Sequence, residues 1–325
     1  MKYLILSLFG VIAIVAGLSF AILNNQVSVQ SKSDMSAQTV PIIPIPSAPQ
    51  ASSTASSSVE EATSTPTVPE IGFLNPLIFQ GDTLVADVSS TGVFPVNASL
   101  DGRSLSVFKY QDSYRIVGAI GATEKIGPHS LAVSFSDGSS VNEQVYVRAT
   151  KFSLVDLGVP EKLGQTADEL VQNLAVEQSA LDSIVALKTN LAFSSGFRLP
   201  LADASHIAAP FGEIRKTGDQ EIRHLGIDFS ASKGTEVYAI NNGTVREAED
   251  DPIYGNMVAI DHGAGIFSLY MHLDQIKAKV GQTVKAGQIL GTVGDTGYAT
   301  GPHLHLSIKI GAISVDPVKF IDIFR

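Results

Sequence analysis

Short runs of β-forming residues, separated by glycine and other turn signals, dominate the chain from about residue 71 onward and favour a mainly β fold. Runs such as Leu84–Val88 and Leu131–Phe135 alternate apolar residues with polar or small ones. More than half of the 28 glycines lie after residue 200, among similar runs such as Met257–Asp261. Because 325 residues exceed one ordinary domain, we expect two β units.

The first unit, residues 71–150, is predicted to be a small β-sandwich with an immunoglobulin-like arrangement. Asp101-Gly102 and Asp137-Gly138 each lie between two β-type runs. An Asp-Gly pair in this position is a strong signal for a tight hairpin, and the spacing of the runs suits a sandwich. No group of residues with catalytic or metal-binding character lies in this segment.

The N-terminal residues predict a route out of the cytoplasm. An uncharged run from Tyr3 to Leu23 follows Met1 and Lys2. A helix of this length rises roughly 30 Å and spans a bilayer, whereas a cleaved signal peptide has an apolar stretch of about 7–15 residues. Residues 1–25 are therefore predicted to be a transmembrane anchor, with a signal peptide cleaved after Ala21 as the alternative. Both interpretations place the remainder in the cell envelope, outside the cytoplasmic membrane, or in a secreted form.

Two linking segments are predicted. Residues 26–70 are rich in Ser, Thr and Pro and have too few apolar residues for a core, so they predict a disordered tether. Residues 151–195 predict a short helical connector, because Thr166-Ala-Asp-Glu169 fits a capping box. An apolar stripe at helical spacing follows and consists of Leu170, Leu174, Leu181, Ile184 and Val185.

Charge and cysteine content exclude several classes of protein. The formal net charge is -10 and no block of Lys or Arg occurs, which argues against nucleic acid as a partner. The absence of cysteine excludes disulfide scaffolds, thiol catalysis and Cys-ligated zinc. A metal site in this chain must therefore be built from His, Asp or Glu.

Histidines concentrate after residue 194, where six of the seven occur. His303 and His305 lie two apart in a β-type run, so their side chains share one face of a strand. The spacing of His224 and Asp228 also places both on one face. Together these residues indicate a zinc site, and three protein ligands with a position left for water are typical of a catalytic site.

These motifs, in this order, resemble the lysostaphin/LytM-type (M23) zinc endopeptidases of peptidoglycan. The resemblance rests on His224-x-x-x-Asp228, Tyr270-Met-His272 and Gly297-Tyr-Ala-Thr-Gly-Pro-His-Leu-His305. It covers roughly residues 205–320 and extends to shorter motifs, which are Pro210-Phe-Gly212, Asn242-Gly-Thr-Val245, Tyr254-Gly-Asn256, Val280-Gly-Gln-Thr-Val-Lys-Ala-Gly-Gln288 and Asp316-Pro317. Residues 196–325 are therefore predicted to be an antiparallel β metallopeptidase domain of the LytM type.

The resemblance implies one zinc ion per chain, with His224, Asp228 and His305 as its ligands and His272 and His303 as catalytic histidines. It implies a membrane-anchored zinc metalloendopeptidase that hydrolyses peptide bonds in peptidoglycan cross-links or stem peptides by a zinc-activated water. Family members cut either D-alanyl-diaminopimelate cross-links or glycine-rich bridges, and the sequence leaves both open. The predicted partners are peptidoglycan, the membrane and proteins of the envelope or of cell division.

Two alternatives belong to other classes. A non-cutting peptidoglycan-binding or hydrolase-activating protein of the same fold is the main one. The complete set of five residues argues against it only for the C-terminal domain, and the β unit of 71–148 could serve the binding role. A lipoyl or biotin carrier domain shares the Val280-Gly-x-x-Val284 pattern but lacks the required lysine motif. His262 is interpreted as a strand-end residue or as a residue that supports the metal ligands from behind, and His206 is given no role.

Overall fold

The computed structural model describes residues 69–89, 92–156 and 184–325, together with positions 166, 168–169, 171–172, 174 and 181–182. These residues fall within one compact unit, Thr63–Arg325. The predicted anchor, 1–25, and nearly all of the predicted tether, 26–70, lie outside the described residues. In the part of the chain that the structure describes, no helix is both long and apolar enough to cross a membrane.

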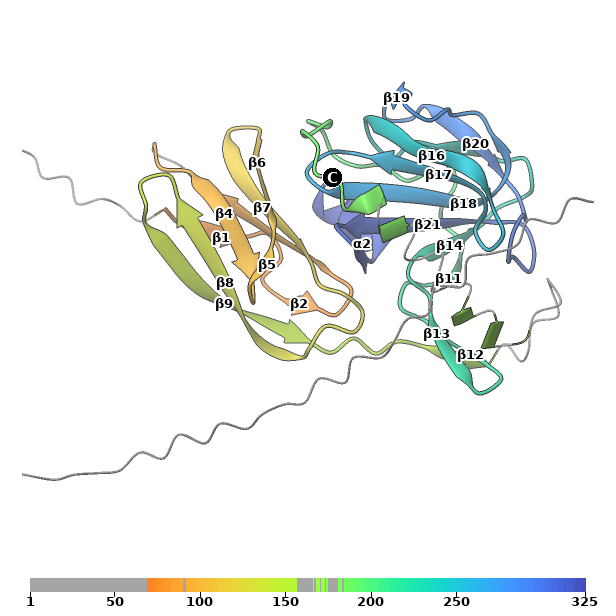
Figure 1. Cartoon of the computed structure of the whole chain (residues 1–325), viewed down its shortest axis with the longest axis horizontal. Helices are drawn as coiled ribbons and strands as arrows, with labels where there is room; N and C mark the ends of the chain where they lie inside the picture. The colour runs from red at the N-terminus through yellow and green to blue at the C-terminus, as the bar shows by residue number, and fades with distance from the viewer. Residues whose placement is uncertain are drawn as a thin grey trace, which may run out of the picture. The chain divides into compact units, whose positions relative to one another are not determined.

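Residues 71–148 form two sheets (Figure 1). The four-stranded sheet consists, in spatial order, of β1 (Ile71–Phe73), β3 (Thr83–Val88), β7 (Ser113–Ala119) and β6 (Ser106–Tyr110). The five-stranded sheet consists of β2 (Ile78–Phe79), β9 (Ser140–Arg148), β8 (Gly127–Phe135), β4 (Pro95–Leu100) and β5 (Arg103–Ser104). All their pairs are antiparallel except β2 with β9.

A single apolar cluster joins these two sheets. It contains Leu84 of the first sheet and Leu131 of the second, both without solvent exposure. The predicted hairpin turns lie where expected, because Asp101-Gly102 separates β4 from β5 and Asp137-Gly138 separates β8 from β9. Asp101 and Gly102 both have positive φ values, 49° and 82°, as a type I′ turn requires.

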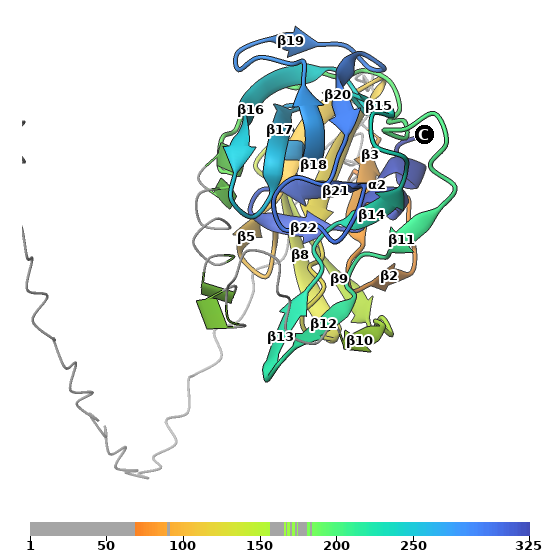
Figure 2. The same ribbon diagram turned by 90° about the vertical axis from the view of Figure 1, so that its right-hand side faces the viewer.

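The C-terminal part is built on a ten-stranded sheet (cyan to blue in Figure 1; turned in Figure 2). Its main path runs β11 (Ile207–Ala209), β14 (Ile227–Ser230), β21 (His303–Ile310), β18 (Ile266–Ile276), β17 (Gly255–Asp261), β16 (Gly243–Asp251) and β19 (Thr283–Val284). Three more strands join this path and are β15 (Glu236–Tyr238), β20 (Ile289–Val293) and β22 (Ile313–Val315).

A separate three-stranded sheet is formed by strands that lie on both sides of β11 in the sequence. Its strands are β10 (Leu154–Asp156), β12 (Ile214–Thr217) and β13 (Gln220–Arg223), in that order. β12 and β13 form an antiparallel hairpin, and β10 joins β12 in parallel. This hairpin supplies Arg215 and Arg223, which line the cavity described below.

The large sheet has two faces of different character. Along β21, Leu304, Leu306 and Ile308 have no solvent exposure and belong to the main apolar cluster. The alternate residues, His303, His305 and Ser307, occupy the other face, because successive side chains in a strand point to opposite sides. The period-2 pattern of this strand therefore separates its core residues from its polar ones.

Among the described residues, helical structure occurs in the connector and near the C-terminal end. α2 (Pro317–Ile323) begins at Asp316, whose side chain accepts hydrogen bonds from the backbone N–H of Val318 and Lys319. In the connector, the predicted capping box is present: the Thr166 N–H donates to Glu169 Oε2 and the Glu169 N–H donates to Thr166 Oγ1. The helical stripe is buried at Leu181 and Val185, in a cluster with Met257 and Met271 of the large sheet, and Leu170 lies outside the described residues.

The prediction of a mainly β chain is confirmed. The proposed boundaries at 25, 70, 150 and 195 and the immunoglobulin-like arrangement of the first unit stay predictions. The main apolar cluster includes Val85, Tyr110 and Val117 of the four-stranded sheet beside residues of the large sheet. The first unit and the C-terminal part therefore share part of one core.

His262 supplies a pH test of stability away from the predicted metal site. Its ring has no solvent exposure, and its two nitrogens contact Asn242 O at 2.7 Å and Ser268 Oγ at 2.8 Å. Burial lowers the pKa of His262 to about 4. The unfolded chain takes up a proton at this residue as pH falls below its ordinary pKa of about 6.5, and the folded chain does not.

The free energy of unfolding should therefore decrease as pH falls from about 6.5 to 4, by at most about 3 kcal/mol from this residue. We expect His262→Gln, which does not titrate, to show a shallower pH dependence than the unmodified chain. Urea unfolding of both proteins at pH 7, 5.5 and 4.5 measures the difference. Equal slopes for the two proteins would contradict the prediction.

Candidate active site

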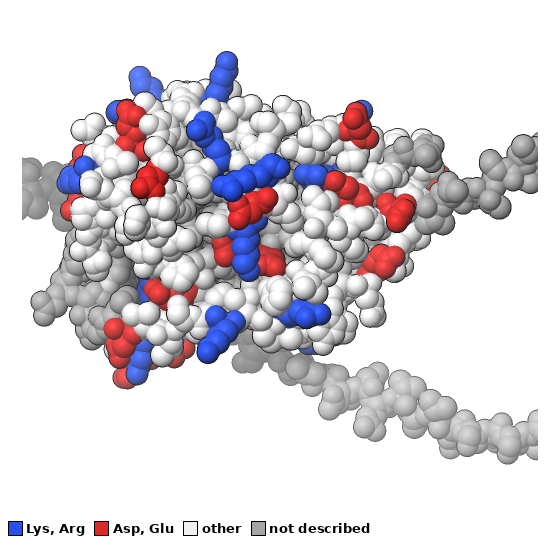
Figure 3. Space-filling view, turned by 180° about the vertical axis from the view of Figure 1, so that it is seen from behind, with Lys and Arg blue, Asp and Glu red and all other residues white. Residues whose placement is uncertain are grey.

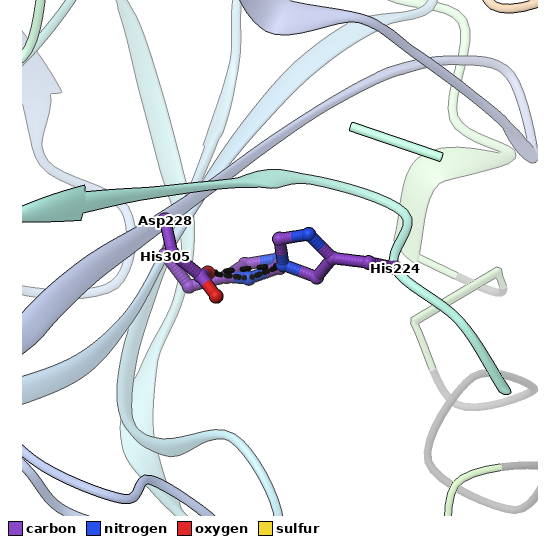
Figure 4. A group of neighbouring side chains, drawn as sticks. All are labelled: His224, Asp228 and His305. Carbon is purple, nitrogen blue, oxygen red and sulfur yellow. Dashed lines mark hydrogen bonds and ion pairs between the residues drawn. The ribbon is translucent and has the colours of Figure 1, made fainter. Parts of the chain in front are cut away.

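Three side chains converge on one point beside the paired strands β14 and β21 (Figure 4). His224 Nε2 lies 3.0 Å from Asp228 Oδ1 and 3.0 Å from His305 Nδ1. His305 Nδ1 lies 2.8 Å from Asp228 Oδ1. The register of the sheet explains the last contact, because Asp228 of β14 is paired directly with His305 of β21.

Groups outside the triangle fix how these donors are presented. His224 Nδ1 lies 2.9 Å from the carbonyl oxygen of Pro210, and a carbonyl only accepts, so Nδ1 carries the proton and Nε2 keeps its lone pair. Arg215 donates from Nη2 to Asp228 Oδ2 at 2.8 Å. Asp228 Oδ1 therefore faces the two histidines, while Oδ2 accepts the hydrogen bond from Arg215. Arg215 also donates to Glu213 Oε1 at 3.1 Å.

Electrostatics keep this cluster in the form that binds a cation. Burial alone would raise the pKa of Asp228, but its close contacts with His224 and His305 outweigh burial and hold this pKa well below its usual range. Burial lowers the pKa of His305, against the opposing effect of Asp228. An ionised carboxylate with neutral imidazoles is the protonation state that a metal site requires.

The donor set fits one metal ion. All three ligand atoms lie within 4.8 Å of one another, and the two histidines and the carboxylate are chemically suited to zinc. Separations of 2.8 to 3.0 Å allow one ion to contact all three atoms at the usual bond lengths of about 2.0–2.2 Å. A centre with three protein ligands leaves a further position for water or substrate.

His272 reaches the same region through an irregularity in the sheet. The pairing of β17 with β18 shifts between Asn256 and Val258, so Met271 and His272 oppose one residue of β17. His272 has a φ of 61°, which a non-glycine residue adopts only where the surrounding structure enforces it. The bulge therefore redirects one side chain of a buried central strand.

His272 and His303 stand together beside the triangle, with ring centres 4.8 Å apart. His272 Nδ1 lies 2.9 Å from Thr296 O and His303 Nδ1 lies 2.8 Å from Gly301 O, so the Nδ1 of each ring carries a proton and donates it to a backbone carbonyl. His303 Nε2 is 3.8 Å from Asp228 Oδ1. Burial, assisted by His305 and His303, lowers the pKa of His272 to about 3, so this ring is neutral at neutral pH.

A cavity of about 310 Å³ lies over the cluster. His224, His272 and His305 line it, and the rest of its wall combines apolar residues with basic and hydroxyl-bearing ones. The other lining residues are Leu174, Leu181, Arg215, Ile222, Arg223, Leu225, Ile253, Tyr254, Met271, Tyr298, Ser307, Lys309 and Ser314.

Acidic and basic side chains are interspersed over the face of the molecule in Figure 3, without a large area of either sign.

The structure brings together all five residues singled out in the sequence. His224, Asp228 and His305 form the triangle, and His272 and His303 lie next to it. His262 lies in the core, and His206 is exposed, with its ring Nδ1 2.9 Å from Ser205 Oγ. The metal-ligand and catalytic roles themselves stay predictions.

Sequence reasoning missed the residues that hold and extend the site. Arg215 comes from the β12–β13 hairpin, and nothing in its sequence spacing connects it with Asp228. Lys309 follows His305 on β21 with even spacing, and this period-2 signal was available in the sequence but was not used. Tyr298 lies inside the matched Gly297-to-His305 motif and lines the cavity.

Comparison with known proteins gives the class. The model of peptidase family M23 matches residues 222–317. Peptidoglycan DD-endopeptidase ShyA of Vibrio cholerae is 41% identical over 96 residues, which are 30% of this chain and 22% of that protein. DD-carboxypeptidase/endopeptidase Mpg of Neisseria meningitidis is 37% identical over 125 residues, 38% of this chain and 29% of that protein. The chain therefore spans less than a third of either relative.

A crystal structure from Pseudomonas aeruginosa, named as a peptidase M23, has a TM-score of 0.58 and 27% identity. The match covers 77% of this chain and 96% of the Pseudomonas aeruginosa chain. The likeness therefore extends beyond residues 222–317 to the preceding sheets. Residues 222–317 therefore form a domain of peptidase family M23, a family of metallopeptidases. The resemblance seen in the sequence is confirmed.

Arg215 gives a test of how the site is held. Arg215→Met removes the donor from Asp228 Oδ2 and frees the carboxylate to rotate, so we expect metal affinity to fall about 10- to 100-fold. Competition with a chelator of known affinity measures this loss. Arg148→Met, at an exposed position of β9, is the matched control. Unchanged affinity in Arg215→Met would show that the ion pair does not position the ligand.

Proposed function

We propose that the chain is a zinc metalloendopeptidase that hydrolyses peptide bonds in the cross-links or stem peptides of peptidoglycan. The observation that supports this most is the juxtaposition of the His224, Asp228 and His305 donors with two further histidines at the wall of one cavity. The names of the relatives, which include DD-endopeptidases, point to the same substrate.

The residues divide the work by their positions. His224, Asp228 and His305 would hold the zinc ion, one per chain. When bound, zinc lowers the pKa of a water ligand to about 7 and polarises a scissile carbonyl. His272 and His303 are not part of the triangle but lie next to it, and the Nδ1 of each ring donates to a backbone carbonyl.

The two histidines suit proton transfer. A neutral imidazole accepts the proton of an attacking water and returns it to the leaving amine, and the resulting N–H donates to negative charge on the carbonyl oxygen. Hydrogen bonds to Thr296 O and Gly301 O keep both rings in the tautomer that this task needs. The neutral state of His272 avoids repulsion of a nearby cation.

Cleavage is tested on purified peptidoglycan with the full, zinc-loaded chain and mass spectrometry of the released fragments. We expect His303→Ala and His272→Ala to lower the rate about 10²- to 10⁴-fold while metal content stays normal, because neither residue belongs to the triangle. His305→Ala should lose both metal and activity. His206→Ala, at an exposed position, is the control.

New fragments from the unmodified chain alone would identify the bond by mass. No fragments from a folded chain with bound zinc would contradict cleavage and favour the non-cutting alternative, a peptidoglycan-binding or hydrolase-activating protein of the same fold.

We also propose that the chain is anchored in the cytoplasmic membrane by residues 1–25, with its folded part on the outer side, where peptidoglycan and envelope proteins are available. The uncharged run from Tyr3 to Leu23 supports this proposal. Alkaline extraction of membranes should leave the full chain in the pellet and release a chain that lacks residues 1–25. A mature protein that begins at residue 22 in the soluble fraction would instead indicate a cleaved signal peptide.

A further inference from the structure

The cavity over the metal triangle has an uneven charge. Its lining includes three basic residues, Arg215, Arg223 and Lys309, and no acidic one among the described residues. The chain as a whole has 32 acidic and 22 basic residues, so this wall is opposite in sign to the protein. Electrostatic complementarity therefore favours a substrate that carries carboxylates.

Two of the three cations already have close partners. Arg215 binds Asp228 Oδ2 at 2.8 Å, and Arg223 donates to Gly212 O at 3.0 Å with its guanidinium 4.9 Å from the ring centre of Phe152. Lys309 is different. Its Nζ reaches Asp182 Oδ1 and Ala312 O only at 3.4 Å, beyond the usual range of a strong N–H···O bond.

Lys309 is buried in the cavity wall, on the same strand face as the metal triangle. Its side chain is 3% exposed. It lies four residues after His305 on β21, so the two side chains point to the same side and their Cα atoms are roughly 13 Å apart. A peptide bound with its scissile bond at the triangle therefore meets Lys309 some residues away from the bond that is cut.

A second donor lies beside Lys309 with no partner. Ser314 of β22 is paired with Lys309 across the sheet and lines the same cavity. It is 5% exposed, and its buried Oγ has no hydrogen-bond partner among the described residues. An unpaired buried hydroxyl costs free energy unless something binds it. Ser307, the neighbouring hydroxyl, is by contrast occupied by Leu225 O at 2.7 Å.

We propose that Lys309 and Ser314 form a subsite that binds a carboxylate of the substrate peptide, at the end of the cavity away from the metal triangle. This inference rests on the proposed peptidase function and specifies its substrate class. Stem peptides that contain diaminopimelate carry free carboxylates, whereas a glycine bridge carries none along its length. The subsite therefore selects acidic stem peptides over glycine bridges.

Asp182 of the connector shows that this position accepts a carboxylate. Its Oδ1 is 3.4 Å from Lys309 Nζ, and its side chain is 39% exposed. A substrate carboxylate must compete with Asp182 for the same ammonium. If the pair were only structural, loss of either partner would have the same effect. If it is a substrate subsite, the two losses have opposite effects on binding.

The experiment measures binding by fluorescence anisotropy, with a labelled diaminopimelate stem peptide and the same peptide with its carboxylates amidated. The protein is the full chain with zinc and the His303→Ala change, so that the peptide is not cut. Lys309→Met, Ser314→Ala and Asp182→Asn are compared with Lys279→Met, a matched change at an exposed lysine. Thermal unfolding and zinc content confirm that each variant is folded and loaded.

We expect Lys309→Met to weaken binding of the acidic peptide about tenfold or more, the loss of one charge-assisted hydrogen bond, and to leave the amidated peptide unchanged. Ser314→Ala should weaken it less, in the same direction and without loss of stability. Asp182→Asn should strengthen binding of the acidic peptide. Lys279→Met should change neither.

Equal effects of Lys309→Met on both peptides, or shifts of the same sign in Lys309→Met and Asp182→Asn, would overturn the subsite. Cleavage of cross-linked dimers by the unmodified chain is scored separately. Selective binding without cleavage would retain the subsite and reject the peptidase, and cleavage without selectivity for carboxylates would do the reverse.

Discussion

The site depends on the register between β14 and β21. Asp228 is paired with His305 and Ser230 with His303, so a carboxylate and an imidazole from distant parts of the sequence meet across two central strands. Because side chains alternate along a strand, a slip of one residue would turn His303 and His305 into the core and bring Leu304 and Leu306 to the surface. The apolar face of β21 therefore protects the geometry of its polar face.

Two local departures from regular structure complete the arrangement. The bulge at Met271 and His272 turns a histidine of a central strand toward the triangle, at the cost of an uncommon backbone conformation. Gly226, between His224 and Asp228, has no room for a side chain, because a Cβ there would collide with the ring of His305 and the carbonyl of Leu306. The sheet supplies the frame, and these two points adjust it.

Much of this arrangement was predictable from residue patterns. Alternation in the β-type runs identified strands such as β3, β8 and β17, and the Asp-Gly pairs identified two hairpin turns, because both signals are local. The even spacing of His303 and His305 predicted a shared face. His224 and Asp228 were predicted to share one face of a strand or helix, and their side chains do meet. Only Asp228 lies in β14, however, so the two residues are brought together by a different backbone geometry from the one expected. Arg215 and Ser314 were missed because long-range pairing places them, and sequence spacing carries no record of it.

The origin of the three donors has a consequence for how an ion enters. Asp228 and His305 belong to paired strands, whereas His224 follows the β12–β13 hairpin and is attached to it through its backbone hydrogen bonds with Gly212 and Glu213. Two of the three proposed protein ligands are therefore preorganised by the sheet, and most of the entropy cost of ordering the site falls on the segment that carries His224. Metal occupancy should then be felt chiefly as rigidity of that hairpin, which makes its amide hydrogen exchange a local reporter of the ion.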